Sequence, residues 1–127
     1  SQGVKKYILL NVSAAFHSKY MLEAQNKLSS EIKKTNFVSS KVPIISNYNA
    51  ALNSNSNDIV NALLKQMANK VNWTKSVKRL EDLKENKIIE IGPGRVLSGL
   101  IKRISNKFDI VSINKIEDLN KLEINKL

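Results

Sequence analysis

The chain contains no cysteine and only one histidine among its 127 residues. The lack of cysteine excludes disulfides, thiolate metal ligands and a cysteine nucleophile, and nothing points to an oxidising compartment, so we expect a cytoplasmic protein. No cluster of carboxylates accompanies the single histidine, so we expect no metal site. The longest apolar runs, such as residues 7–10, have four or five residues. A membrane span needs roughly 20, so the sequence predicts no membrane-spanning segment.

Arginine is also scarce, since only three of the 21 basic residues are Arg. The formal net charge of +10 would attract nucleic acid, anionic membranes, cofactor phosphates or an acidic protein. Sites that recognise nucleic acid or phosphate favour Arg for its bidentate fork, and the few aromatic residues do not alternate with basic runs. We therefore interpret the charge mainly as a solvated lysine-rich surface. A basic α/β module that binds nucleic acid or nucleotide phosphates is the alternative.

The hydrophobic pattern alternates between short apolar runs and amphipathic stretches. The short runs predict strands at residues 7–12, 42–46, 87–91 and 108–113. Apolar residues spaced by three or four predict helices at residues 18–34, 57–69, 73–85, 96–104 and 116–122. The second of these helices is expected to be capped by Asn57 and to end near Asn69. Residues 47–57, rich in Asn and Ser, are expected to be a loop. This order predicts an α/β fold with a mainly parallel sheet covered by helices on both faces.

His17 lies where the first expected strand meets the first expected helix, a position at which α/β folds often place functional groups. Imidazole is the side chain best suited to accept a proton near neutral pH, so His17 is a candidate general base for a hydroxyl nucleophile. A hydrogen-bonded loop histidine with no chemical role is the competing interpretation.

No partner nucleophile is evident in the sequence. The Gly-x-Ser-x-Gly pattern of a nucleophile elbow is absent, and Ser98 lies inside a helical pattern, where its hydroxyl is expected to bond locally to the backbone. Gly92-Pro93-Gly94 follows a strand and precedes a helix, but it matches neither the dinucleotide nor the P-loop pattern. We interpret it as a tight structural turn in preference to a phosphate site.

Four segments, taken in order, resemble a known family. They are residues 12–18 (VSAAFHS) with Met21, residues 42–47 (VPIISN), residues 64–67 (LKQM) with 71–77 (VNWTKSV), and residues 90–97 (EIGPGRVL). Together they resemble the C-terminal part of the malonyl-CoA:acyl-carrier-protein transacylases of fatty-acid synthesis and the related acyltransferase domains. The resemblance implies an incomplete α/β-hydrolase-like fold. It assigns residues 1–13 to the last strand of a ferredoxin-like small subdomain and residues 14–127 to the large α/β subdomain.

The resemblance also implies a ping-pong mechanism, in which a serine takes malonyl from coenzyme A and passes it to a phosphopantetheine thiol. His17 matches the general base, the main-chain carbonyl of Gln66 matches the group that orients it, and Phe16 matches a bulky residue of the acyl pocket. The implied partners are an acyl carrier protein, the malonyl-CoA substrate and an N-terminal part that supplies the serine. No permanent cofactor, nucleic acid or membrane partner is implied. The chain by itself is therefore expected to be inactive.

Overall fold

The computed structural model describes residues 12–122, which fall into two compact units divided between Val71 and Asn72. The expected strand at residues 7–12 lies almost entirely outside the described residues. Both units combine helices with short strands, so the α/β class is confirmed. Among the described residues, no helix is long and apolar enough to cross a membrane.

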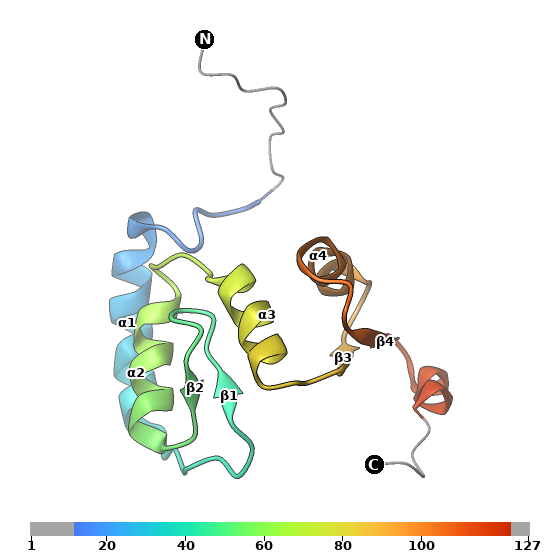
Figure 1. Cartoon of the computed structure of the whole chain (residues 1–127). Helices are drawn as coiled ribbons and strands as arrows, with labels where there is room; N and C mark the ends of the chain where they lie inside the picture. Colours follow the sequence, from blue (N-terminus) through green and yellow to red (C-terminus); the bar gives the residue numbers. More distant parts are fainter. Residues whose placement is uncertain (1–11, 123–127) are drawn as a thin grey trace. The chain divides into compact units, whose positions relative to one another are not determined.

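The first unit is built on two helices that pack against each other. It comprises the 3-10 turn η1 (Lys19–Met21), α1 (Leu22–Lys34), β1 (Ile44–Ile45), β2 (Leu52–Asn53) and α2 (Ser56–Gln66). α1 and α2 lie side by side in opposite directions, so the chain preceding α1 lies next to the end of α2 (Figure 1). β1 and β2 form an antiparallel hairpin that contacts α2 through β2. This arrangement brings His17 to the last turn of α2.

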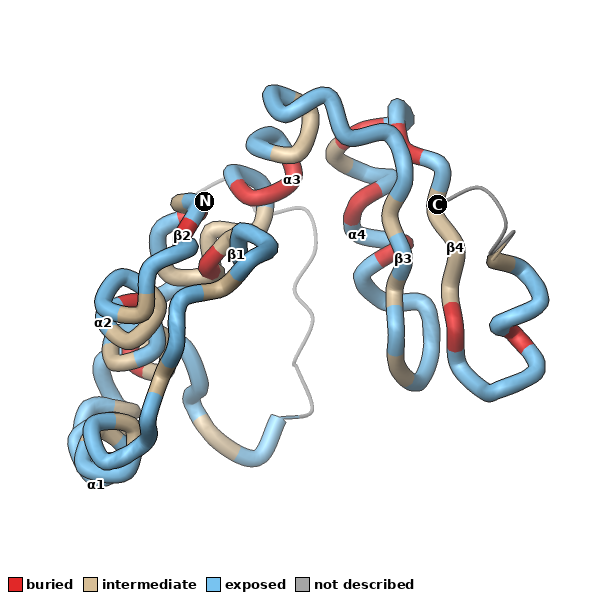
Figure 2. The backbone as a smooth tube through the Cα atoms, turned by 90° about the horizontal axis from the view of Figure 1, so that it is seen from below, coloured by how far each residue is buried: buried red, intermediate tan, exposed pale blue. Residues whose placement is uncertain are grey.

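The second unit has a small hydrophobic core beside a parallel strand pair. It comprises α3 (Trp73–Asp82), β3 (Lys87–Ile91), α4 (Val96–Ile104), β4 (Asp109–Ile113) and the 3-10 segment η2 (Ile116–Lys121). β3 and β4 pair in parallel from Lys87 opposite Asp109 to Ile91 opposite Ile113. The centre of the core is Val77, Ile101 and Phe108. Buried residues are few along the tube in Figure 2, and long apolar side chains such as Ile91 stay exposed.

Several details differ from the sequence-based expectation. Residues 19–21 and 116–121 form 3-10 segments instead of α-helix, and α2 and α3 end at Gln66 and Asp82, earlier than expected. The Asn/Ser-rich stretch contains β2, because its chain turns back through Ala50, at φ +57°, and pairs with β1. The cap of α2 is Asn55, not Asn57, since the Asn55 side chain accepts a hydrogen bond from the N–H of Asp58 at 2.9 Å. Within residues 12–122, the strands form two separate two-stranded sheets, of which only β3–β4 is parallel, instead of one mainly parallel sheet.

The Gly-Pro-Gly segment is a turn held by a carboxylate. Gly92 and Gly94 adopt positive φ values of +141° and +88°, a backbone region that favours glycine. The Glu90 carboxylate accepts hydrogen bonds from the N–H groups of Leu97 (3.0 Å) and Ser98 (3.1 Å) at the start of α4. The Ser98 hydroxyl also donates to Glu90, and this contact is the main reason that the pKa of Glu90 is lowered. A protein carboxylate thus takes up the amides that a phosphate would need, which supports a structural role for the turn.

Asp118 fixes η2 and gives the second unit a predictable response to acid. The Lys121 ammonium donates to Asp118 at 2.6 Å, and the N–H groups of Asn114 and Lys115 donate at 2.9 and 3.2 Å. The Lys121 hydrogen bond is the largest cause that lowers the pKa of Asp118 from 3.8 to about 2. Because folding lowers this pKa, the carboxylate stabilises the folded state fully above pH 3.8, and the effect is lost as pH falls to about 2.

We therefore expect the parent chain to be more stable than an Asp118→Asn variant above pH 3.8, by a margin that shrinks as pH falls from 3.8 through about 2. Thermal unfolding of both proteins across this range measures the difference. A stability difference between the two proteins that stays constant down to pH 2 would contradict the stabilising role of the Asp118 carboxylate.

Candidate active site

His17 occupies an unusual backbone conformation at the end of α2. Its φ is +63°, in the left-handed region that non-glycine residues rarely adopt and that costs about 1–3 kcal/mol. The His17 N–H donates to the main-chain oxygen of Met67 at 2.9 Å, which holds this conformation. Ser18 follows as the cap of η1: its hydroxyl oxygen accepts a hydrogen bond from the Tyr20 N–H, and its hydroxyl group donates one to the Ala15 carbonyl. Hydrogen bonds thus hold the backbone at His17 itself and at the residue that follows it.

The His17 ring is oriented by a second carbonyl from the same helix end. Its Nδ1 lies 3.2 Å from the main-chain oxygen of Gln66, the contact that the family resemblance implies. A carbonyl oxygen can only accept, so Nδ1 must carry the hydrogen in this contact. In the neutral ring, Nε2 then has the free lone pair. The last carbonyls of an α-helix lack partners within the helix, and here two successive ones serve His17.

The exposed ring of Phe16 lies beside this site. Phe16 is 55% exposed, and with His17 it borders a cavity of about 230 Å³. The other lining residues are Leu28, Ile32, Leu63, Gln66 and Met67. The lining is largely apolar, and His17 is the one ionisable side chain in it. A small acyl group could occupy such a space next to the imidazole.

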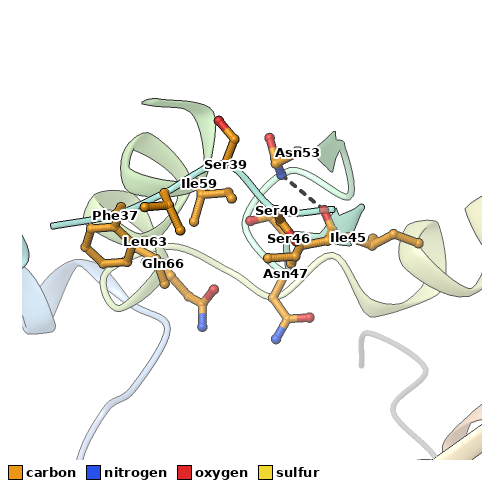
Figure 3. A pocket seen from close by; sticks show the side chains of 13 residues that line it. Phe37, Ser39, Ser40, Ile45, Ser46, Asn47, Asn53, Ile59, Leu63 and Gln66 are labelled. Carbon is orange, nitrogen blue, oxygen red and sulfur yellow. Dashed lines mark hydrogen bonds between the residues drawn. The ribbon is translucent and has the colours of Figure 1, made fainter. Parts of the chain in front are cut away.

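A larger cavity lies on the other side of Gln66. It measures about 630 Å³ and is formed between α2, the β1–β2 hairpin and the segment before the hairpin (Figure 3). The Gln66 side chain lines it, while the Gln66 carbonyl contacts His17. Ser46 also lines this cavity, and its buried hydroxyl has no hydrogen-bond partner among the described residues. Gln66 therefore borders both cavities, and its carbonyl contacts His17.

Ser98 does not have the surroundings of a nucleophile. It is 7% exposed, and its hydroxyl bonds to the Glu90 carboxylate and lies 3.0 Å from the Ser112 hydroxyl. Sequence analysis expected a backbone partner; the structure shows that the partners are side chains. The reason is that Glu90 and Ser112 lie on paired strands in register.

Sequence reasoning named His17 and Gln66, which the structure brings together, but it did not name Met67. Only the resemblance singled out Gln66, and nothing in the pattern marked the next carbonyl as the acceptor for the His17 N–H. The available signal was the helix end itself, because its last carbonyls must find donors outside the helix.

A histidine whose Nδ1–H faces a carbonyl has Nε2 available as a proton acceptor, an arrangement that suits acid–base chemistry. No family model matches the chain. The malonyl CoA-acyl carrier protein transacylase of Escherichia coli K12 is 35% identical over 113 residues, which are 89% of this chain and 37% of that protein. The protein of the same name from Staphylococcus aureus MSSA476 is 36% identical over 119 residues, which are 94% of this chain and 39% of that protein.

Solved structures agree with these relatives. A structure of a type II PKS acyl-carrier protein in complex with its malonyl-transacylase matches with a TM-score of 0.89 and 31% identity, covering 98% of this chain and 40% of that one. The Vibrio cholerae acyl carrier protein S-malonyltransferase matches with a TM-score of 0.88 and 30% identity, covering 95% and 40%. Over 89 to 94% of its length, the chain is thus similar to malonyl CoA-acyl carrier protein transacylases. It spans 37 to 39% of the length of these two curated relatives.

Proposed function

We propose that this chain is the base-bearing part of a malonyl-CoA:acyl-carrier-protein transacylase of fatty-acid biosynthesis. The observation that carries the proposal is the hydrogen bond from His17 Nδ1 to the Gln66 carbonyl, which leaves Nε2 free to accept a proton. The serine nucleophile would come from another part of the catalytic unit. The two relatives named above support the malonyl substrate and the carrier-protein partner by their names. They give no support to the nucleic-acid alternative.

The proposed reaction has two half-reactions, and His17 moves a proton in each. In the first, Nε2 takes the proton of the serine hydroxyl while the oxygen attacks the malonyl thioester, and the proton passes to the departing coenzyme A sulfur. In the second, Nε2 takes the proton of the phosphopantetheine thiol, the sulfur attacks the malonyl-serine ester, and the serine oxygen recovers the proton. The Gln66 carbonyl keeps the ring oriented and favours the imidazolium formed in between.

The acyl group would occupy the cavity that Phe16 and His17 share. The Phe16 ring is proposed to crowd a branch on the α-carbon and so favour malonyl. The net charge of +10 suits both proposed partners, because coenzyme A carries phosphates and an acidic carrier protein would be attracted.

The wider architecture is proposed on the resemblance. Residues 14–127 would be the C-terminal part of a large, α/β-hydrolase-like subdomain, and residues 1–13 the last strand of a ferredoxin-like small subdomain. A cytoplasmic setting is proposed from the lack of cysteine.

A chimera tests the proposed function. This chain replaces the matching segment of the Staphylococcus aureus relative, so that one polypeptide contains both the relative's remaining sequence and His17. We expect the chimera to transfer malonyl from malonyl-CoA to the phosphopantetheine thiol of a carrier protein, as followed by intact-mass analysis of that protein. The relative without its matching segment is the control and is expected to be inactive. A chimera with native-like circular dichroism and no transfer would overturn the proposal.

A further inference from the structure

A third hydrogen bond joins the start of α1 to the end of α2, and it does not involve His17. The N–H of Ala68 donates to the side-chain oxygen of Gln25, in α1, at 2.9 Å. An N–H group can only donate, so the Gln25 atom that faces it must be the oxygen. Residues 66, 67 and 68 therefore each make one bond to the segment that contains His17 and α1.

The Gln25 bond affects where α2 ends. In a continuing α-helix, the N–H of Ala68 would donate to the carbonyl four residues earlier. Here it donates to Gln25, and α2 ends at Gln66. The carbonyls of Gln66 and Met67 then lie at the helix terminus, where they accept from His17. The same helix end thus donates one hydrogen bond, from the Ala68 N–H to Gln25, and accepts two from His17 through the carbonyls of Gln66 and Met67.

The burial of Ala68 makes the hydrogen bond to Gln25 energetically important. Ala68 is only 8% exposed, so its N–H has little access to water. A buried donor that loses its acceptor is costly, so the chain would have to move. Either the helix would extend by returning the N–H to its ladder, or the turn would shift toward solvent. Both movements change the direction of the neighbouring Gln66 carbonyl.

We propose that Gln25 is a positioning residue for His17: its side-chain oxygen fixes the Ala68 N–H and thereby aims the Gln66 carbonyl at Nδ1. The importance of the effect for catalysis rests on the proposed function. The geometric effect itself concerns only this chain, because all four residues lie in the first unit.

The test reads the tautomer of the His17 ring in the full 127-residue chain. His17 is the only histidine, so histidine labelled with ¹⁵N gives one unambiguous ring. Long-range ¹H–¹⁵N spectra of the neutral ring measure the ratio of the Nδ1–H to the Nε2–H form. Gln25→Met keeps side-chain length and helix propensity but lacks a good acceptor, whereas Gln25→Glu keeps an acceptor oxygen. Asn26→Ala, at the exposed neighbouring position of α1, controls for general effects on the helix.

We expect Gln25→Met to lower the ratio of the Nδ1–H to the Nε2–H form by about fivefold, the equivalent of one ordinary hydrogen bond. Gln25→Glu and Asn26→Ala are expected to keep the parent ratio. An unchanged ratio in Gln25→Met, or an equal fall in Gln25→Glu or Asn26→Ala, would overturn the proposal. Loss of helical circular dichroism in Gln25→Met would make Gln25 a folding residue and would also overturn it. No substrate is needed, so failure of the chimera to transfer malonyl stays distinguishable from failure of this proposal.

Discussion

Replacing His17 by alanine in the chimera is expected to lower malonyl transfer by about 10²- to 10⁴-fold, the usual contribution of a positioned general base. The physical reason is that neither a serine hydroxyl nor a neutral thiol is a strong nucleophile until a base removes its proton. Both half-reactions need the same Nε2, so both are expected to slow. Quenched time-course assays of malonyl transfer to the carrier protein, at saturating malonyl-CoA, measure the fall in transfer rate.

The control for His17→Ala is thermal unfolding of the same chimera. His17 is exposed, and its φ of +63° is strained for any residue with a side chain, so alanine neither relieves this strain nor empties a core. The loss of the ring contact to Gln66 is expected to change the melting temperature little, since one ordinary hydrogen bond contributes about 1 kcal/mol. A variant that folds normally and retains transfer within about tenfold of the parent, well short of a general-base loss, would show that His17 is not the base.

The 127-residue chain alone is expected to transfer no measurable malonyl. A base accelerates acyl transfer only with its nucleophile, and removal of one member of such a unit costs nearly as much as removal of all of them. The sequence holds no nucleophile elbow, and Ser98 is buried against Glu90. Purified chain is incubated with malonyl-CoA and a carrier protein, and the mass of the carrier protein is followed.

The matched comparison for the isolated chain is the chimera at the same molar concentration. Transfer by the chimera with none by the chain agrees with the proposal. If the isolated chain transfers malonyl and His17→Ala abolishes this transfer, a nucleophile lies within these 127 residues. That result would contradict the proposal that the serine comes from another part of the catalytic unit.

Strong local patterns made several elements predictable. β3 is found at residues 87–91 and α4 at residues 96–104, as expected, because a short apolar run and a clear helical stripe specify each of them. The Gly-Pro-Gly turn between them was predictable as well, since two positive φ values favour glycine. Local rules of this kind depend on neighbours in sequence, so a single sequence carries them.

Features that depend on distant partners were not predictable. β2 has only two residues and is set by pairing with β1, so no periodicity revealed it. The bond between Gln25 and Ala68 joins residues 43 positions apart, and a glutamine on a helix gives no sign of its acceptor role. The contact of His17 with Gln66 spans 49 positions. It was expected only because the sequence resembles a family, and spacing alone left His17 open between a base and a loop histidine.

The most direct test of the central claim compares two substitutions at the two ends of one hydrogen bond. Gln66→Ala shortens a residue that borders both cavities but keeps the carbonyl that holds His17, whereas His17→Ala removes the proposed base. The measurement is the ratio of the malonyl transfer rates of these two chimeras. The proposal predicts that Gln66→Ala is faster by about 10²-fold or more, because it leaves the base in place. Equal rates in two folded chimeras would contradict the assignment of His17 as the base held by the Gln66 carbonyl.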